Sequence, residues 1–252
     1  MKKREDLTKD QFLGGKLTLF QPRSGYRANI DSVLLASAIQ AKAGQSVLEL
    51  GCGIGAVMLC LMTRVPGLKV TGIEMQEKYA KLARFNSRFN NLPLKVLRCD
   101  ITNLPIEAKT QVFDYVVLNP PFNPVFNESH ATENEKYLSK NEGTPNLSGW
   151  LDIAITRCKP RDELVIIHKV ERLAQILNSI SCRIGDIKIL PLTSFKNQKA
   201  KRILIKGCKG TRGPLVLLPP QVLHKKHVRP GYETTYSKEI EKVLRKGKKL
   251  NF

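Results

Sequence analysis

Residues 46–55 read Ser-Val-Leu-Glu-Leu-Gly-Cys-Gly-Ile-Gly, and this stretch decides the fold of the chain. Its first five residues form a mainly apolar run with β character, which predicts a short buried strand. Glycines follow at positions 51, 53 and 55, and an apolar run over 56–62 predicts a helix directly after them. Glycine permits a sharp turn close to a ligand, and a helix N-terminus offers free N–H groups to an anionic group. The stretch therefore predicts a strand, a glycine turn and a helix around a bound ligand.

The spacing of these glycines separates the loop from two other glycine-rich loops. The dinucleotide fingerprint is G-x-G-x-x-G and the P-loop is G-x-x-x-x-G-K-[ST], whereas this loop is G-x-G-x-G and follows Glu49. The pattern resembles the cofactor loop of class I methyltransferases, which bind S-adenosylmethionine. That resemblance implies that Glu49, Gly51, Gly53 and Gly55 belong to the cofactor site. A purely structural glycine turn is the alternative.

The remainder of the chain alternates between strand and helix patterns. Strand-like runs recur at 69–74, 94–99, 113–118, 163–168, 186–192 and 202–206, with helical patterns between them until the last pair. This order predicts an α/β fold with a seven-stranded, mostly parallel sheet, helices on both faces and one antiparallel hairpin at its end. The resemblance implies the Rossmann-like class I methyltransferase form. We expect a single domain over 1–252, with an N-terminal extension over about 1–32 and a basic C-terminal tail over about 221–252.

Two acidic residues follow strands beyond the glycine loop. Glu74 ends the second predicted strand, 23 residues after Gly51, where a carboxylate can accept hydrogen bonds from ribose hydroxyls. Asp100 follows the third predicted strand. In class I methyltransferases an acidic residue there binds the adenine amino group of the cofactor, and a simple turn or cap residue is the alternative. Both acids are expected at the carboxyl edge of the sheet, where ligands bind.

The sharpest motif is Asn119-Pro120-Pro121-Phe122, which directly follows the fourth predicted strand. Prolines at the end of a strand fix φ and remove ladder donors, so the Asn side chain and the Pro120 carbonyl can face a ligand. The tetrad matches the [DNS]-P-P-[YFW] motif of methyltransferases that act on exocyclic or amide nitrogens. By that resemblance the four residues are catalytic, Asn119 also adjoins the cofactor, and Phe122 stacks on the target base. A plain turn is the alternative.

Two segments flank this predicted site. Tyr26, Arg27 and Asp31 precede the glycine loop by about twenty residues, so we expect them to fold over its mouth and contact the cofactor. Their alternative roles are a packed Tyr, an exposed Arg and a helix-capping Asp. The polar stretch 123–146 has little periodicity, and it predicts a long loop of the kind that often covers active sites.

The charge of the chain points to a polyanionic partner. Forty-two Lys and Arg against 22 Asp and Glu give a net charge of +20. The basic residues concentrate in two tracts, 194–213 and 224–249, and we expect both to contact the phosphates of a nucleic acid. A merely basic soluble surface is the alternative.

The composition of the chain indicates the cellular compartment in which the protein works. Hydrophobic residues make up 42%, and no apolar run approaches the roughly 18 residues that a membrane span requires. No secretory signal is visible, and the six cysteines are scattered without a C-x-x-C pair. We therefore expect a cytoplasmic protein with reduced, mostly buried thiols, no metal site and no membrane partner.

Beyond the core motifs, the chain resembles the bacterial tRNA(Val) (adenine(37)-N6)-methyltransferases over almost its whole length. The likeness includes residues 12–15, the segments 21–27 and 31–36 before the glycine loop, the tetrad, and residues 189–192. It implies transfer of a methyl group from S-adenosylmethionine to the N6 of an adenine in tRNA. Two alternatives stay open: a glutamine N5-methyltransferase of release factors, which shares the tetrad, and a non-catalytic RNA-binding protein with the same fold.

Overall fold

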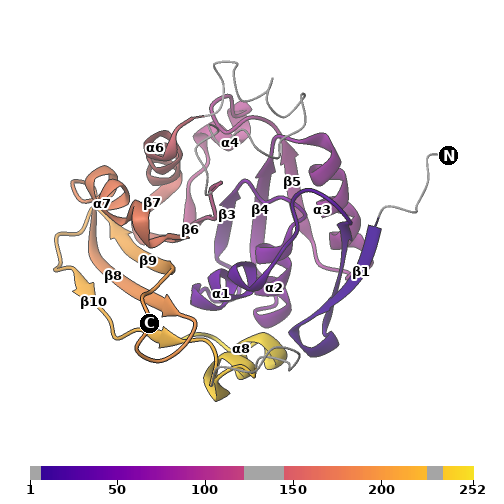
Figure 1. The fold of residues 1–252 in the computed structure, drawn as a ribbon. Helices are drawn as coiled ribbons and strands as arrows, with labels where there is room; N and C mark the ends of the chain where they lie inside the picture. The colour runs from indigo at the N-terminus through magenta and orange to yellow at the C-terminus, as the bar shows by residue number, and fades with distance from the viewer. Residues whose placement is uncertain (1–6, 122–144, 226–234) are drawn as a thin grey trace.

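The computed structural model describes residues 7–121, 145–225 and 235–252 (Figure 1). Its central sheet contains nine strands: β3 Ser46–Leu50, β4 Lys69–Glu74, β5 Leu94–Arg98, β6 Phe113–Leu118, β7 Cys158–Lys169, β8 Ile184–Thr193, β9 Arg202–Lys209, β10 Val216–Leu217 and β11 Gln221–Val222. The strand order is β10-β8-β9-β7-β6-β3-β4-β5, and β11 also pairs with β8. Only β9 runs antiparallel to its neighbours.

All seven strands expected from the sequence are present, together with the antiparallel strand near one end of the sheet. The prediction of seven strands is corrected to nine, because β10 and β11 add two residues each beside β8. The predicted strand 163–168 is longer in the structure, because residues 158–162 extend β7 through a register shift, with Arg161 at φ +67°. The irregularity places three extra residues on β7, since Phe113 pairs with Cys158 and Tyr115 with Glu163, and the strand continues beyond it.

Helices cover both faces of the sheet because its strands alternate their side chains. They are α1 Ile30–Ala38, α2 Ala56–Arg64, α3 Glu77–Phe89, α4 Ile106–Thr110, α6 Leu147–Arg157, α7 Leu173–Ile180 and α8 Lys238–Lys246. Val47 and Val117 belong to the apolar cluster beneath α1, α2, α3 and α8, whereas Leu48 and Val116 belong to the cluster beneath α6 and α7. Successive residues of one strand thus pack into the apolar clusters on opposite faces of the sheet.

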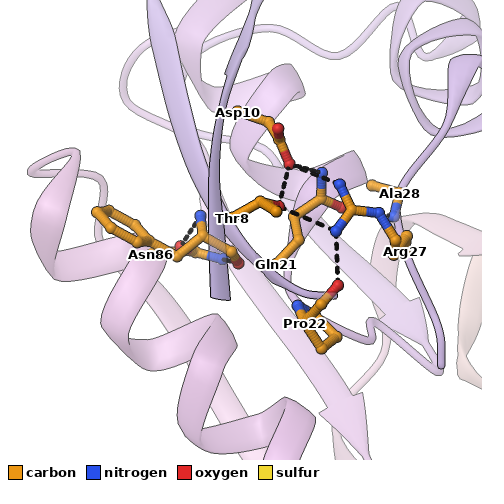
Figure 2. A network of polar contacts seen from close by, with 8 residues as sticks. Thr8, Asp10, Gln21, Pro22, Arg27, Ala28 and Asn86 are labelled. Atoms are coloured by element: carbon orange, nitrogen blue, oxygen red, sulfur yellow. Dashed lines mark hydrogen bonds and ion pairs between the residues drawn. The ribbon is translucent and has the colours of Figure 1, made fainter. Parts of the chain in front are cut away.

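A small hairpin lies beside α3, outside the main sheet (Figure 1). It consists of β1 Leu7–Phe12 and β2 Leu17–Pro22, joined by the short 3-10 turn η2 Leu13–Gly15. The guanidinium of Arg27 donates to the Asp10 carboxylate at 2.8 Å, the Thr8 hydroxyl at 2.9 Å and the Pro22 carbonyl at 2.6 Å (Figure 2). This network ties the hairpin to the segment that leads into α1.

The C-terminal helix α8 packs against α1 and η2, with Ile240 and Val243 buried. Ser237 caps it, and the Leu250 amide donates to the Ser37 carbonyl at 2.9 Å. In the described ranges, no helix is long and apolar enough to cross a membrane. The six cysteines are free thiols, of which three are buried and Cys182 is exposed.

Candidate active site

The glycine loop turns at the carboxyl end of β3, as the sequence predicts. Gly51, Gly53 and Gly55 have φ values of +71°, +53° and +83°, a region that L side chains rarely adopt. The Cys52 amide donates to the Ile73 carbonyl at 2.8 Å, which joins the loop to the end of β4. Gly51 and Gly53 line a cavity of about 490 Å³, and Gly55 caps α2 instead.

The two predicted acids lie on the wall of the same cavity. Glu74 is 8% exposed, and its carboxylate accepts from the Gly53 amide at 3.0 Å and from the Gln76 amide at 2.7 Å. Burial raises the pKa of Glu74, although these backbone donors oppose the shift. One oxygen of Asp100 accepts from both the amide and the hydroxyl of Thr102, so Asp100 also makes the turn that was its alternative role.

Asn119, Pro120 and Pro121 line this cavity at the end of β6. Because β6 pairs with β3 in parallel, with Leu118 opposite Leu50, the tetrad begins level with the glycine loop. Pro120 is buried, and Asn119 is half-buried. Phe122 and residues 123–144 of the expected covering loop lie outside the described residues.

Two aromatic rings stand over the glycines. An ideal Cβ on Gly53 would lie 2.5 Å from Cε1 of Tyr26, and one on Gly51 would lie 2.8 Å from Cη2 of Trp150. The Tyr26 amide donates to the Tyr79 hydroxyl at 2.9 Å, and both tyrosines line the cavity. Tyr26 was expected from the sequence, whereas Trp150 and Tyr79 were missed. Trp150 is the single tryptophan of the chain, which was the one available signal.

Two other expected cofactor residues, Asp31 and Arg27, have side chains that pair with other parts of the protein. Asp31 is 5% exposed, and its carboxylate pairs with Nε of Arg202 at 3.2 Å. Asn29, rather than Asp31, caps α1, since its side chain accepts from the Asp31 amide. Arg27 does line the cavity, but its guanidinium is bonded to the hairpin. Asp31 is thus absent from the cavity lining and is paired with Arg202, and its direct contact with the cofactor stays a prediction.

Glu49 lies beneath the cavity rather than on its wall. It is 2% exposed, and its Oε2 atom has no hydrogen-bond partner within the described part of the chain. Burial raises the pKa of Glu49 well above its ordinary value, and the Glu74 carboxylate raises it further. A protonated Glu49 avoids an unpaired buried charge next to Glu74. Glu49 is thus absent from the cavity lining, and its contact with the cofactor stays a prediction.

The basic tract 194–213 is divided between two edges of the sheet. Lys196, Lys199 and Lys201 are exposed in the connection from β8 to β9, and Arg202 starts β9 opposite Lys169 at the end of β7. This is the edge that carries the cavity. β9 then runs to the opposite edge, where Lys209 donates to the Cys158 carbonyl at 2.7 Å.

The second tract follows α8 along α1. The helix begins near β11, where the Ser237 amide donates to the Leu223 carbonyl, and its end lies near the C-terminus of α2. Within the described ranges, the exposed basic residues of this tract are Lys225, Lys238, Lys242, Arg245, Lys246, Lys248 and Lys249. Residues 226–234 of this tract lie outside the described ranges.

The cavity suits the cofactor that the sequence implies. Its size falls in the usual range for small-molecule sites, and a side chain on Gly51 or Gly53 would fill space that the loop leaves open. Glu74 and Asp100 place carboxylates on its wall, and Asn119 places a polar side chain there. The negative charge of the Glu74 and Asp100 carboxylates also complements the positive charge of a sulfonium group.

Comparison with known proteins agrees with this geometry. A tRNA1(Val) (adenine(37)-N6)-methyltransferase from Porphyromonas gingivalis is 29% identical over 77% of this chain and 79% of its own length. A release factor glutamine methyltransferase from Aliivibrio fischeri is 33% identical over 36% of this chain and 31% of its own. A solved structure of a predicted O-methyltransferase from Agrobacterium tumefaciens has a TM-score of 0.66, with 22% identity over 84% of this chain and 94% of that one.

The family model named methyltransferase small domain matches residues 24–166, from the segment before α1 through β7. That range contains the glycine loop, Glu74, Asp100 and the Asn119 motif. The chain therefore belongs to the methyltransferase small domain family, class I methyltransferases whose cofactor is S-adenosylmethionine.

Proposed function

We propose that this protein methylates the exocyclic N6 of an adenine in tRNA, with A37 of a valine tRNA as the target. The observation that carries the proposal is the position of Asn119 and Pro120 on the wall of the glycine-loop cavity. An amide oxygen followed by a proline carbonyl there offers two acceptors to one amino group. The 29% identical relative from Porphyromonas gingivalis, named for this reaction, supports the choice of substrate.

Each residue has a defined task in this proposal. The adenine amino nitrogen is a poor nucleophile because its lone pair is delocalised into the ring. Acceptance of its two N–H bonds by the Asn119 side chain and the Pro120 carbonyl favours a nitrogen whose lone pair is directed at the methyl donor. Phe122, which follows them, holds the base by stacking, an interaction typically worth about 1–3 kcal/mol. No strong general base is required, since the attached proton becomes acidic once the methyl group arrives.

The remaining cavity residues bind and orient. S-adenosylmethionine supplies an activated methyl group when it is bound. Glu74 accepts from its ribose and Asp100 from its adenine amino group, while Gly51 and Gly53 admit it close to the backbone. The exposed lysines at the cavity edge, Lys196, Lys199 and Lys201, neutralise tRNA phosphates, so binding weakens as salt rises. An unpaired base in an anticodon loop can be splayed into such a site.

The test is methyl transfer from labelled S-adenosylmethionine into total tRNA, with a release factor fraction assayed in parallel. After digestion to nucleosides, mass analysis is expected to find N6-methyladenosine. A valine tRNA transcript with A37 replaced by guanine should accept no label. Asn119→Ala should remove most transfer while its cofactor dissociation constant stays unchanged.

The outcomes separate the alternatives. Label in protein instead of RNA favours the glutamine methyltransferase, which the Aliivibrio fischeri relative represents. Binding of RNA without any binding of cofactor favours the non-catalytic reading. Wild-type turnover by Asn119→Ala contradicts the role given to that side chain.

A further inference from the structure

Three phenylalanines form a cluster on the surface, between the hairpin and α3. The Phe20 ring makes edge contacts with Phe85 and Phe89, at centroid distances of 5.0 and 4.9 Å. Phe85 and Phe89 nevertheless stay 37% and 47% exposed. We call this cluster of Phe20, Phe85 and Phe89 the aromatic face. Burial of large aromatic rings is energetically favourable, so a cluster of exposed rings indicates a surface that binds a partner.

The backbone of β2 beneath the aromatic face is held to α3 by paired hydrogen bonds. Asn86 accepts from the Phe20 amide at 2.8 Å and donates to the Phe20 carbonyl at 3.1 Å. One helical turn later, Asn90 makes the same pair of bonds to Thr18, at 3.0 and 2.8 Å. Figure 2 shows Asn86 beside the hairpin. The two asparagines thus occupy the hydrogen-bonding edge of β2 as a neighbouring strand would, and they fix Phe20 between the other rings.

One cation lies over a ring of the aromatic face, and two more lie along α3. The Lys9 ammonium lies 5.5 Å from the centroid of Phe89, and Lys78 lies 4.6 Å from that of Tyr79. Arg88, which precedes Phe89 in the sequence, is exposed. Among the described residues, no acidic side chain forms an ion pair with these three cations. The arrangement of exposed rings and unpaired cations complements a strand that carries both bases and phosphates.

The aromatic face is connected to the cavity by a single helix. Gln76 and Tyr79, at the start of α3, line the cavity. Phe89 ends the helix 13 residues beyond Gln76, about 20 Å away at 1.5 Å per residue. A nucleotide strand on the aromatic face is therefore separate from a base in the cavity, yet one folded RNA can reach both.

We propose that the aromatic face binds RNA, stacking unpaired bases on Phe85 and Phe89 while Lys9, Lys78 and Arg88 hold the phosphates. This deepens the proposed function and rests on it in one respect, that the RNA is the substrate tRNA. The face holds a part of the tRNA distant from the target base. It thereby selects a whole folded tRNA over a short stem-loop.

The experiment compares Phe85→Leu/Phe89→Leu with wild type, because leucine keeps apolar packing but removes the ring face. The dissociation constant for labelled tRNA, at one salt concentration, should rise at least about fivefold, the loss expected for one stacked base. The constant for S-adenosylmethionine and the thermal unfolding midpoint should not change. Leu217→Ala, at a residue 65% exposed on β10, is the matched control and should bind tRNA as wild type does.

Two further measurements complete the test. Arg88→Gln should reduce the slope of log affinity against log salt by about 0.7–0.9. Ultraviolet cross-linking of the wild-type protein to tRNA should label a peptide containing Phe85 or Phe89, which requires no variant to fold.

RNA binding by the aromatic face and methylation of tRNA can be contradicted independently of each other. If wild type methylates tRNA while the double leucine variant binds tRNA unchanged, the aromatic face is overturned and the function stands. If wild type transfers no label to tRNA but the leucine variant loses RNA affinity, the face stands and the function falls. A wild-type dimer that the leucine variant converts to monomer, with unchanged RNA affinity, overturns the face in favour of a second copy.

Discussion

The Trp150 ring occupies the space that a side chain on Gly51 would need, with 2.8 Å between Cη2 and the ideal Cβ position. Gly51 belongs to the loop after β3, and Trp150 comes from α6, about a hundred residues later. The contact joins the glycine loop to the helix that follows the Asn119 motif. The wall of the cavity therefore depends on a close backbone approach as well as on the polar groups that face it.

Gly51→Ala should harm the protein in two ways. At φ +71° an L residue is strained by about 1–2 kcal/mol, and the new methyl group must displace Trp150. We expect weaker cofactor binding in equilibrium dialysis and a lower free energy of unfolding.

Gly210→Ala is the matched control, since Gly210 has φ +75° with open space around it. If the two variants bind cofactor equally, the Trp150 contact is unimportant.

Glu74→Gln should weaken cofactor binding, because an amide cannot accept on both sides as the carboxylate does. The pH dependence follows from the raised pKa of Glu74. Affinity in wild type should fall as the pH drops through that raised pKa, because protonation replaces an acceptor for the ribose hydroxyls. The dissociation constant of the variant should lack this dependence. Identical pH profiles for both proteins would remove Glu74 from the site.

Glu49→Gln should change how stability depends on pH. The pKa of Glu49 is raised in the folded protein, so above an ordinary value of 4.5 the unfolded chain releases a proton that the folded protein retains. The free energy of unfolding therefore falls as the pH rises between these two pKa values. The variant lacks this proton, and its stability should fall less steeply than that of wild type in chemical denaturation. Parallel curves from pH 5 to pH 9 would contradict a neutral, buried Glu49.

Asn90→Ala should loosen the hairpin from α3. Its side chain accepts from the amide and donates to the carbonyl of the half-buried Thr18, and a hydrogen bond of this kind typically contributes about 0.5–1.5 kcal/mol. We expect that loss in unfolding free energy and faster hydrogen exchange at the amide of Thr18. Asn90→Asp, which keeps the acceptor but not the donor, should fall between the two. Unchanged exchange in Asn90→Ala would show that the hairpin docks by its apolar side chains alone.

Strands that enter the buried sheet were predictable, because their apolar runs are bounded by glycine, proline or acidic residues. The hairpin strand β1 was missed since Leu-Thr-Lys-Asp-Gln-Phe has neither alternation nor β-branched density. In the structure β1 pairs with β2, and its Thr8 and Asp10 side chains accept from Arg27. Strands β10 and β11 are two residues each, too short for any periodic pattern.

The polar wall of the cavity was predictable because each group follows a strand in a parallel sheet. Trp150 and Tyr79 were not, since helical aromatics look the same whether they face a core or a cavity. The pairing of Asp31 with Arg202 was not predictable, because Arg202 is distant in sequence and belongs to a strand of the sheet. The position of Glu49 beneath the cavity was not predictable, because alternation along β3 alone does not tell which face of the strand adjoins the ligand.

The docking of α8 on α1 also affects how the protein is made. Lys238 is synthesised 200 residues after Ala38, which takes roughly 10–40 s at typical ribosome speeds. Until then, the nascent chain displays the side of α1 that Ile240 and Val243 later cover. A holdase chaperone that binds exposed apolar surface thus has a defined place and a defined time window on this protein.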